Sequence, residues 1–557
     1  MSKEAQYIVG LDLGTLSGRA VVIRASDGEE LASAVMDYPH GVMDHELSAG
    51  DGQQLPPDFA LVVPADYFDV IRVIVPQALE EAGVATDEVV ALGIDVTSAT
   101  VIATDAEGVP LCEKEEFKNN PHAYVKLWKH HGAEDQAKRI VDLARERGEE
   151  WLERYGGILS SEMLMPKTLE TLEKAPEVYE AAAHFMDSLD WLTWMFTGRL
   201  TYAAGSSGYK RNYQDGTYPS EEFLRELNPD FARVFVDKMP APVLALGEKV
   251  GTLNERGQEI TGLGADVVVS SANIDAHATV PAVQGVEAGQ MTAILGTSAV
   301  FLVSAEKYQK VPGVFGIVDG GSVDGMWGYE RGQSAVGDIY AWFVNNCVPP
   351  AYHEEADKRG ISLHELLTEK AEVQEVGEHG LVALDWHNGN RSILVDGALS
   401  GLMVGQSLGT KPEDQYRALL ESTVFGLRVI IENFKNHGVD ITEFIAAGGL
   451  TKNAFLMQMI SDITRLPVST AVSQQAGALG SAIFAAVAAG LYDSVAEAAT
   501  AMGKRVKDAY LPNEERAAEY DELFAHYMYL HDLFGRENEV MHDLKRIRRE
   551  AKARRHG

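Results

Sequence analysis

A short segment near the start of the chain decides the fold: Gly10-Leu11-Asp12-Leu13-Gly14-Thr15-Leu16-Ser17-Gly18-Arg19. It lies within an apolar stretch, residues 7–23, that a glycine-containing turn divides into two strands, which is the pattern of a β-hairpin. Glycine allows a positive φ and lets a phosphate approach the backbone amides, while Thr15 and Ser17 add hydroxyl donors. Arg19 supplies a cation, and the carboxylate of Asp12 can hold a hydrated magnesium ion. Together these residues form a candidate phosphate-binding hairpin.

A similar hairpin recurs in the second half of the chain. Residues 291–295 lead into Gly296-Thr297-Ser298, and a second apolar run follows at residues 299–303. Two hairpins of this kind indicate an internal duplication, and a chain of 557 residues is too long for one ordinary core. We therefore expect two related α/β domains, residues 1–285 and 286–557, with a ligand cleft between them.

The composition is that of a globular protein from a reducing compartment. Apolar residues make up 46% of the chain and charged residues 24%. Cys112 and Cys347 are too few and too isolated for a disulfide framework or a thiolate metal cluster. Because we find no run of about 18 apolar residues and no signal-peptide pattern at the N-terminus, we expect a cytoplasmic protein with no membrane partner.

The net charge of −35 argues against a nucleic-acid partner, because such binding depends on basic surface. An acidic protein that binds a nucleotide must supply local cations and amide donors, with a divalent metal to screen the phosphates. The one basic segment lies at residues 545–555. We interpret it as a solvated helix end, with its cations at the favourable pole of the helix dipole, and a binding patch is the alternative.

Hydrophobic periodicity predicts the elements that flank the motifs. We expect strands at residues 89–96, 99–104 and 443–447, and helices at residues 133–155, 169–185, 187–198, 453–464 and 477–491, with a polar helical C-terminus. Gly198 is placed to end the third of these helices.

The glycine motif matches neither of two familiar nucleotide-binding loops. It lacks the final Gly-Lys-Ser/Thr of a Walker loop, and a strand rather than a helix follows it, unlike a Rossmann fingerprint. The order Asp12-x-Gly14-Thr15, together with Gly296-Thr297-Ser298 and Gly448-Gly449, resembles the three-part nucleotide site of the actin, Hsp70 and hexokinase superfamily. That resemblance implies an α/β fold of two duplicated ribonuclease-H-like (actin-like ATPase) domains with an ATP and sugar cleft between them.

Within this superfamily the chain resembles the FGGY carbohydrate kinases over nearly its whole length. The matching residues are Asp190-Trp191-Leu192, Thr197-Gly198, ANIDAH at 272–277 and GGLTKN at 448–453. Four further segments resemble the bacterial L-ribulokinases of that family, namely residues 93–100, 127–131, 208–210 and 330–343. The resemblance implies ATP-dependent phosphorylation of L-ribulose to L-ribulose 5-phosphate, a step of L-arabinose catabolism, with Mg²⁺ as cofactor.

The resemblance also implies the site residues. The family's general base matches Asp275, which would accept the proton of a sugar hydroxyl during phosphoryl transfer, and a cap of the following helix is the alternative. His277 is interpreted as a supporting or packing residue. The implied sugar-binding residues are Thr97, Ser98, Trp128, Lys210, Asp275 and Glu330, with hydroxyls satisfied inside a strand as the alternative for the first two. The implied nucleotide-binding residues are Gly14, Thr15, Ser17, Arg19, Gly296, Thr297, Ser298, Gly448, Gly449 and Asn453, beside a largely apolar, non-basic adenine pocket.

Two other functions stay open. In the first, the chain is a kinase of this type that phosphorylates another ketopentose or pentitol, such as D-ribulose, xylulose or ribitol. The second is a non-metabolic ATPase, a chaperone or filament protein, whose ATP turnover is indifferent to sugar. For a kinase we expect the two domains to close on substrate, because each carries one hairpin and both must reach the same phosphates. A homo-oligomer is compatible with the sequence.

Overall fold

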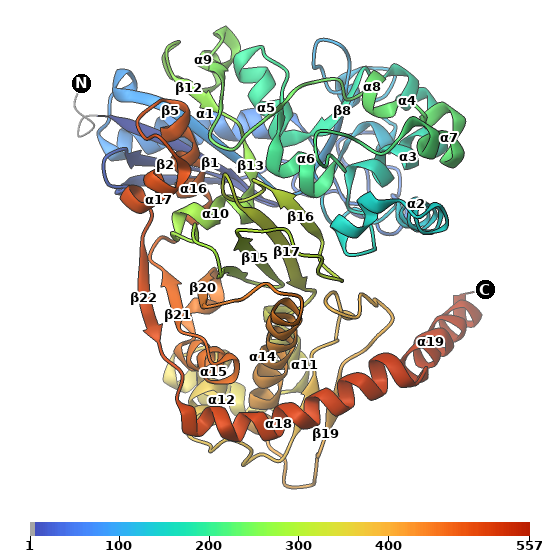
Figure 1. Cartoon of the computed structure of the whole chain (residues 1–557), viewed down its shortest axis with the longest axis vertical. Helices are drawn as coiled ribbons and strands as arrows, with labels where there is room; N and C mark the ends of the chain where they lie inside the picture. The colour runs from blue at the N-terminus through green and yellow to red at the C-terminus, as the bar shows by residue number, and fades with distance from the viewer. Residues whose placement is uncertain (1–5, 557) are drawn as a thin grey trace.

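A computed structural model describes residues 6–556, in which two large sheets repeat one topology (Figure 1). The first sheet has the order β11 (Lys249–Thr252), β12 (Val268–Ser270), β5 (Val89–Val96), β1 (Tyr7–Leu13), β2 (Ser17–Arg24) and β3 (Glu30–Asp37), with β13 (Asn273–Ile274) also beside β5. The second has the order β22 (Arg505–Tyr510), β21 (Val468–Ala471), β20 (Glu443–Ala447), β14 (Gln290–Leu295), β15 (Ala299–Ala305), β17 (Trp327–Gln333) and β16 (Gly316–Asp319).

Six strands of one sheet match six of the other, and only β13 and β16 have no counterpart. In each, an antiparallel hairpin, β1–β2 or β14–β15, continues into a third antiparallel strand, β3 or β17. On its other side the hairpin continues into two parallel strands, β5 and β12 or β20 and β21, and an antiparallel strand, β11 or β22, follows. The duplicated α/β fold predicted from the two hairpins is confirmed.

Helices pack on these sheets and on one another. Those that bear on the site are α1 (Ala65–Ala82), α3 (Leu164–Lys174), α6 (Ala204–Lys210), α10 (Asp275–Ala282), α11 (Gly337–Cys347), α13 (Leu363–Glu372), α14 (Pro412–Asn436), α15 (Ala454–Thr464), α16 (Ala476–Ala488) and α17 (Val495–Met502). A small sheet, β4 (Leu61–Val62), β7 (Val125–Lys126), β6 (Val101–Thr104) and β8 (His184–Asp187), lies beside the first.

The alternation along β1 assigns its residues to two faces. Val9, Leu11 and Leu13 are buried in the core that includes α1, whereas Gly10 and Asp12 face α16 on the opposite side. One strand thus supplies both the apolar face that holds the first sheet to its helices and the carboxylate that reaches the site.

Glycine lets α16 approach the first sheet at backbone distance. A Cβ at Gly10 would lie 2.1 Å from the carbonyl oxygen of Ala478, and a Cβ at Gly480 would lie 1.6 Å from that of Ala278. In Figure 1, α16 lies beside β1, β2 and β5, and α17 packs against α16, although both helices come late in the chain. Gly10 therefore serves helix packing, and the turn of the hairpin begins at Gly14, whose amide donates to Ser17 O at 3.0 Å.

Two of the predicted helices are wrong in extent, and chain-breaking residues explain why. Gly148, with φ 69°, ends α2 (Glu134–Arg147), and a separate 3₁₀ turn follows it. Pro176 begins α4 (Pro176–Ala181) after α3, and the strand β8 then occupies the end of the predicted second helix. The predicted stop at Gly198 is confirmed, since this residue caps α5 (Ser188–Thr197) with φ 74°.

The chain ends in α18 (Glu514–Asp532) and α19 (Val540–His556), which run along the lower half in Figure 1 and extend away from it. Most of the basic side chains of α19 are exposed, and Arg546 pairs with Asp543 and Glu550 of the same helix. Among residues 6–556, we find no helix that combines the length and apolar character needed to cross a membrane.

Candidate active site

A cavity of about 650 Å³ lies between the two sheets and is lined from both halves of the chain. Eleven of the predicted site residues line it, namely Asp12, Gly14, Thr15, Ser17, Arg19, Ser98, Trp128, Lys210, Asp275, Ser298 and Glu330. A second cavity of about 310 Å³ shares Asp12, Thr279, Ile294 and Gly477 with the first and is lined further by Gly448 and Gly449. The hairpin at residues 10–19, the predicted sugar-binding residues and the glycine turn at residues 448–449 therefore surround one continuous region.

Asp275 stands at the start of α10, directly after β13, where the chain turns into the cavity. Its Oδ1 accepts a hydrogen bond from the amide of Ala276 at 2.8 Å. Burial, and next the nearby Asp12 carboxylate, raise the pKa of Asp275 to about 7, because both disfavour its ionised form. A carboxylate of this basicity is suited to accept a proton near neutral pH.

Lys210 and Glu330 form a buried ion pair in the cavity wall. Lys210 Nζ lies 2.8 Å from both carboxylate oxygens of Glu330, and the two side chains are only 6% and 8% exposed. His277 Nε2 contacts Glu330 Oε2 at 3.1 Å, and its ring packs edge-on against Tyr209. Burial alone would raise the pKa of Glu330, but Lys210 and then His277 hold that pKa well below its usual range. Glu330 is thus a fixed negative charge.

Trp128 connects the predicted sugar-binding residues to the predicted phosphate-binding hairpin. Its indole Nε1 donates to Thr15 Oγ1 at 3.1 Å, which orients both side chains at the cavity wall. Ser98 also lines the cavity, but Thr97 does not. The Thr97 hydroxyl is buried and bonds to Thr100 Oγ1 at 2.7 Å, which is the arrangement of a hydroxyl satisfied by its own strand turn.

On the nucleotide side, Arg19 Nη1 lies 2.9 Å from Asp12 Oδ2. Gly448 has φ 93° and approaches Leu295 O so closely that a Cβ would lie 2.5 Å from that oxygen, which requires glycine at this turn. The predicted residues Gly296, Thr297 and Asn453 line neither cavity. The first two form the turn between β14 and β15 and accept backbone hydrogen bonds from the start of α11.

Asn453 caps α15 instead of reaching a cavity. Its Oδ1 accepts from the amide of Leu456 at 3.0 Å, and its Nδ2 donates to Thr368 Oγ1 at 3.4 Å. A contact with the adenosine at this position stays a prediction.

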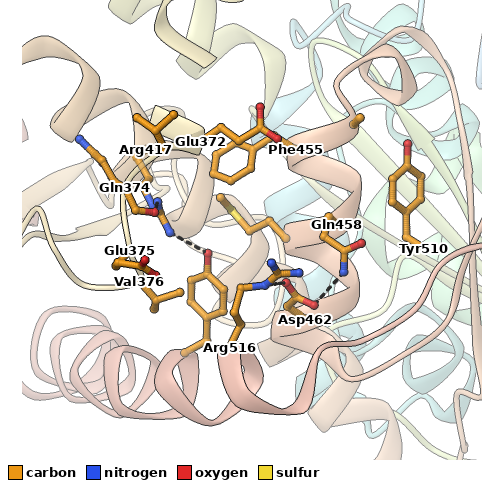
Figure 2. A pocket seen from close by; sticks show the side chains of 14 residues that line it. Glu372, Gln374, Glu375, Val376, Arg417, Phe455, Gln458, Asp462, Tyr510 and Arg516 are labelled. Carbon is orange, nitrogen blue, oxygen red and sulfur yellow. Dashed lines mark hydrogen bonds and ion pairs between the residues drawn. The ribbon is translucent and has the colours of Figure 1, made fainter. Parts of the chain in front are cut away.

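A third cavity, of about 430 Å³, lies against α15 and is drawn in Figure 2. It holds two arginines, and both are paired: Arg516 with Asp462 at 2.7 Å and Arg417 with Glu421 at 2.9 Å. Gln458 donates to Asp462 as well. This charged pocket does not match the apolar, non-basic adenine pocket expected from the sequence.

Sequence reasoning missed three charged residues of the main cavity: Asp37, Glu162 and Arg391. Asp37 had a usable signal, because it ends the strand after the hairpin and pairs in register with Ser17. Glu162 and Arg391 lie in segments without a motif, one in each half of the chain. They approach to 3.5 Å across the cavity, and the Arg391 guanidinium also lies 4.4 Å from the centre of the Phe315 ring.

Comparison with known proteins finds matches along nearly the whole chain. The model described as "FGGY family of carbohydrate kinases, N-terminal domain" matches residues 7–281, and the corresponding C-terminal model matches residues 291–489. A ribulokinase from Mycolicibacterium smegmatis is 51% identical over 99% of this chain and 98% of its own length. A ribulokinase from Bacillus licheniformis is 44% identical over 96% of this chain and 98% of its own length.

Solved structures agree with the fold. A gluconate kinase from Lactobacillus acidophilus superposes with a TM-score of 0.78 at 18% identity, covering 96% of this chain and 99% of its own. A xylulose kinase from the same organism superposes with a TM-score of 0.77, also at 18% identity, covering 96% and 99% of the two chains. At such identities the likeness establishes the shared two-domain architecture.

Proposed function

The chain belongs to the FGGY family of carbohydrate kinases, and from this premise we propose that it transfers the γ-phosphoryl group of ATP to the terminal hydroxyl of L-ribulose. The observation that carries the choice of sugar is the 51% identity, over 99% of the chain, to a ribulokinase. The product is L-ribulose 5-phosphate, which belongs to L-arabinose catabolism, and we expect the reaction in the cytoplasm. We also propose residues 1–285 and 286–557 as its two domains.

Asp275 acts as the general base of this reaction. A sugar hydroxyl is a poor nucleophile at neutral pH, and a carboxylate within hydrogen-bond reach orients it and accepts its proton as the phosphoryl group is transferred. The pKa of about 7 supports this role, since about half of the carboxylate is ionised at pH 7 and most of it above that pH, yet it is basic enough to take the proton.

Lys210, Glu330, Ser98 and Trp128 hold the sugar. Sugars are bound by converging donors and acceptors, and an aromatic face packs against their C–H surface. The Lys210–Glu330 pair offers a donor and an acceptor at one point of the cavity wall. Lys210 also offsets part of the negative charge of Asp275 and Glu330. Thr97 remains a proposed sugar ligand only if its bond to Thr100 opens.

The phosphates of ATP lie against the two hairpin turns, with Gly448 and Gly449 beside the adenosine. Magnesium would be held by Asp12 through water, and when bound it would screen the phosphate charge. The residues fit such an ion, because Mg²⁺ keeps several waters and takes only one or two carboxylates with substrate phosphates. Asp12 borders both cavities, and among the described residues no donor reaches Oδ1 of its buried neighbour Asp95. Within residues 6–556, no cluster of three or more His, Cys, Asp or Glu side chains forms a complete metal cage.

The substrate panel tests the choice of sugar. We expect turnover with L-ribulose to exceed that with D-ribulose, D-xylulose and ribitol, measured as ADP release at equal sugar concentrations. A strong preference for D-xylulose would show that the kinase assignment is right and the ribulokinase assignment wrong. ATP turnover that no sugar changes would instead favour the non-metabolic ATPase.

Closure of the two domains is a second testable consequence. The Glu162–Arg391 pair joins the halves at the cavity, so we expect L-ribulose with a non-hydrolysable ATP analogue to reduce the radius of gyration in small-angle scattering. In Arg391→Met the KM for L-ribulose should rise by up to about fivefold, since partly exposed pairs contribute about 0.2–1 kcal/mol. Arg465→Met, which breaks a pair with Glu514 outside the cavity, is the matched control. An unchanged radius of gyration in the wild type would contradict closure.

A further inference from the structure

Lys167 lies behind the sugar-facing wall of the cavity, in the first half of α3. Its side chain is fully buried, yet no ion pair to a carboxylate forms at its ammonium group among residues 6–556. Nζ instead donates to two backbone carbonyls, Ala99 O at 2.8 Å and Leu127 O at 2.7 Å. A third carbonyl, Lys126 O, lies at 3.4 Å.

The two carbonyls belong to the residues that adjoin the sugar-facing side chains. Ala99 follows Ser98, and its φ of 48° places it in the left-handed region, where a residue with a Cβ is strained unless its surroundings hold it. Leu127 precedes Trp128, the residue that reaches Thr15. One side chain therefore ties together two loops that are about thirty residues apart in sequence and meet at the sugar.

The other buried charged side chains of this region pair with one another. Glu170 is already paired with Lys126 at 2.8 Å and with His130 at 3.0 Å, and Lys126 also donates to Thr171 Oγ1. The carboxylate next to Lys167 in the helix is thus engaged elsewhere. Burial lowers the pKa of Lys167 to about 7, because desolvation disfavours its charged form. In either protonation state its amine keeps at least two N–H donors for the two short bonds.

We propose that Lys167 is a positioning residue of the sugar site, which sets the spacing between the Ser98–Ala99 turn and the Leu127–Trp128 segment by binding the backbone of both. This inference rests on the proposed function insofar as it takes the cavity wall at Ser98 and Trp128 as the sugar site. Lys167 itself does not line the cavity. Its loss should therefore affect sugar binding more than the transfer step or ATP.

The test is Lys167→Met, which keeps most of the side-chain length and removes the donors. We expect the KM for the preferred sugar of the panel to rise about tenfold or more, with kcat reduced by less and the KM for ATP within about twofold. Lys167→Arg retains donors and should recover part of the sugar KM. A folded Lys167→Met protein with the wild-type sugar KM would overturn the proposal.

The matched control is Lys238→Met. Lys238 also donates to two carbonyls of the first half, Tyr179 O at 3.1 Å and Ala182 O at 2.5 Å, but it does not contact the sugar-facing segments. Lys238→Met should lower the melting temperature and leave the sugar KM unchanged. A rise in the sugar KM as large as that in Lys167→Met would show that the Lys167 effect is general destabilisation. If Lys167→Met does not fold, Lys167→Gln replaces it, because the shorter glutamine side chain cannot reach both carbonyls. A wild-type sugar KM in folded Lys167→Gln would then overturn the proposal, whereas failure of the ribulose assignment would be seen in the wild type.

Discussion

Asp275→Asn should lower kcat for L-ribulose phosphorylation by about 10²- to 10⁴-fold, the range that a positioned general base contributes. Asparagine keeps the shape of the side chain but cannot accept the proton of the sugar hydroxyl. ATP binding should persist, because Asp275 belongs to the proposed sugar side of the cavity and the hairpin turns are unchanged. ADP release measures the first effect, and calorimetric titration with a non-hydrolysable ATP analogue measures the second.

Asp385→Asn is the matched control for this change. Asp385 is also a buried carboxyl, whose pKa burial raises to about 6, but it bonds to Gln333 and Tyr527 away from the cavity. Its replacement should leave kcat near the wild-type value in folded protein. Wild-type turnover in Asp275→Asn would show that another group is the base.

The pH dependence of turnover and of stability tests the proposed role of Asp275 further. Because the ionised form of Asp275 is the proposed base and its pKa is about 7, kcat/KM should fall about tenfold for each pH unit below 7. The raised pKa also means that the folded protein binds this proton more tightly than the unfolded chain, so stability falls as pH rises from about 4 to 7. At pH 8, Asp275→Asn should therefore have a higher melting temperature than the wild type, and a lower one would contradict the burial argument.

Lys210→Met is expected to weaken both the fold and sugar binding. Removing one partner of a buried ion pair leaves an uncompensated charge, here Glu330, and typically destabilises by about 3–5 kcal/mol. Loss of a hydrogen bond to a charged group costs about 1.5–3 kcal/mol, which is roughly ten- to hundredfold in the KM for L-ribulose. Chemical denaturation and steady-state kinetics measure the two effects separately.

The double variant Lys210→Met/Glu330→Gln distinguishes the effect of the ion pair on stability from its effect on sugar binding. It removes both charges, so most of the lost stability should return, whereas the sugar KM should stay high because both proposed sugar ligands are gone. Arg417→Met/Glu421→Gln removes a similarly buried pair in α14, outside the main cavity, and should leave the sugar KM unchanged. If the Lys210/Glu330 double variant regains the wild-type KM, the pair serves the fold alone.

Local pattern was enough to predict the elements that surround the site. The strands predicted at residues 89–96 and 443–447 are confirmed at both ends, because their side chains alternate or run apolar between clear turn residues. The helix predicted at residues 453–464 is also confirmed apart from its first residue, Asn453, which is the cap. The two failures, at residues 133–155 and 169–185, arose where a single glycine or proline interrupts helical composition.

The site residues also divide into those that the sequence predicted and those that only the structure brought together. Asp12, Thr15 and Ser17 were predicted from one hairpin, because the residues that make a phosphate turn are neighbours in sequence. Lys210 and Glu330 came from the resemblance to a family, and their contact spans 120 positions of the chain, which no local periodicity records. Glu162, Arg391 and Lys167 carried no motif and became visible only when the two halves and their loops were placed together.

The two hairpins, their duplication and the family thus followed from the sequence alone, since alternation, glycine turns and motif order are properties of short segments. The tertiary structure alone decided that Gly10 packs against α16, that Thr97 bonds to Thr100 and that Asn453 caps a helix. It also decided which charges meet in the cavity. The physical reason is that a side chain's partner is chosen by packing between distant segments, and that packing depends on the whole chain at once.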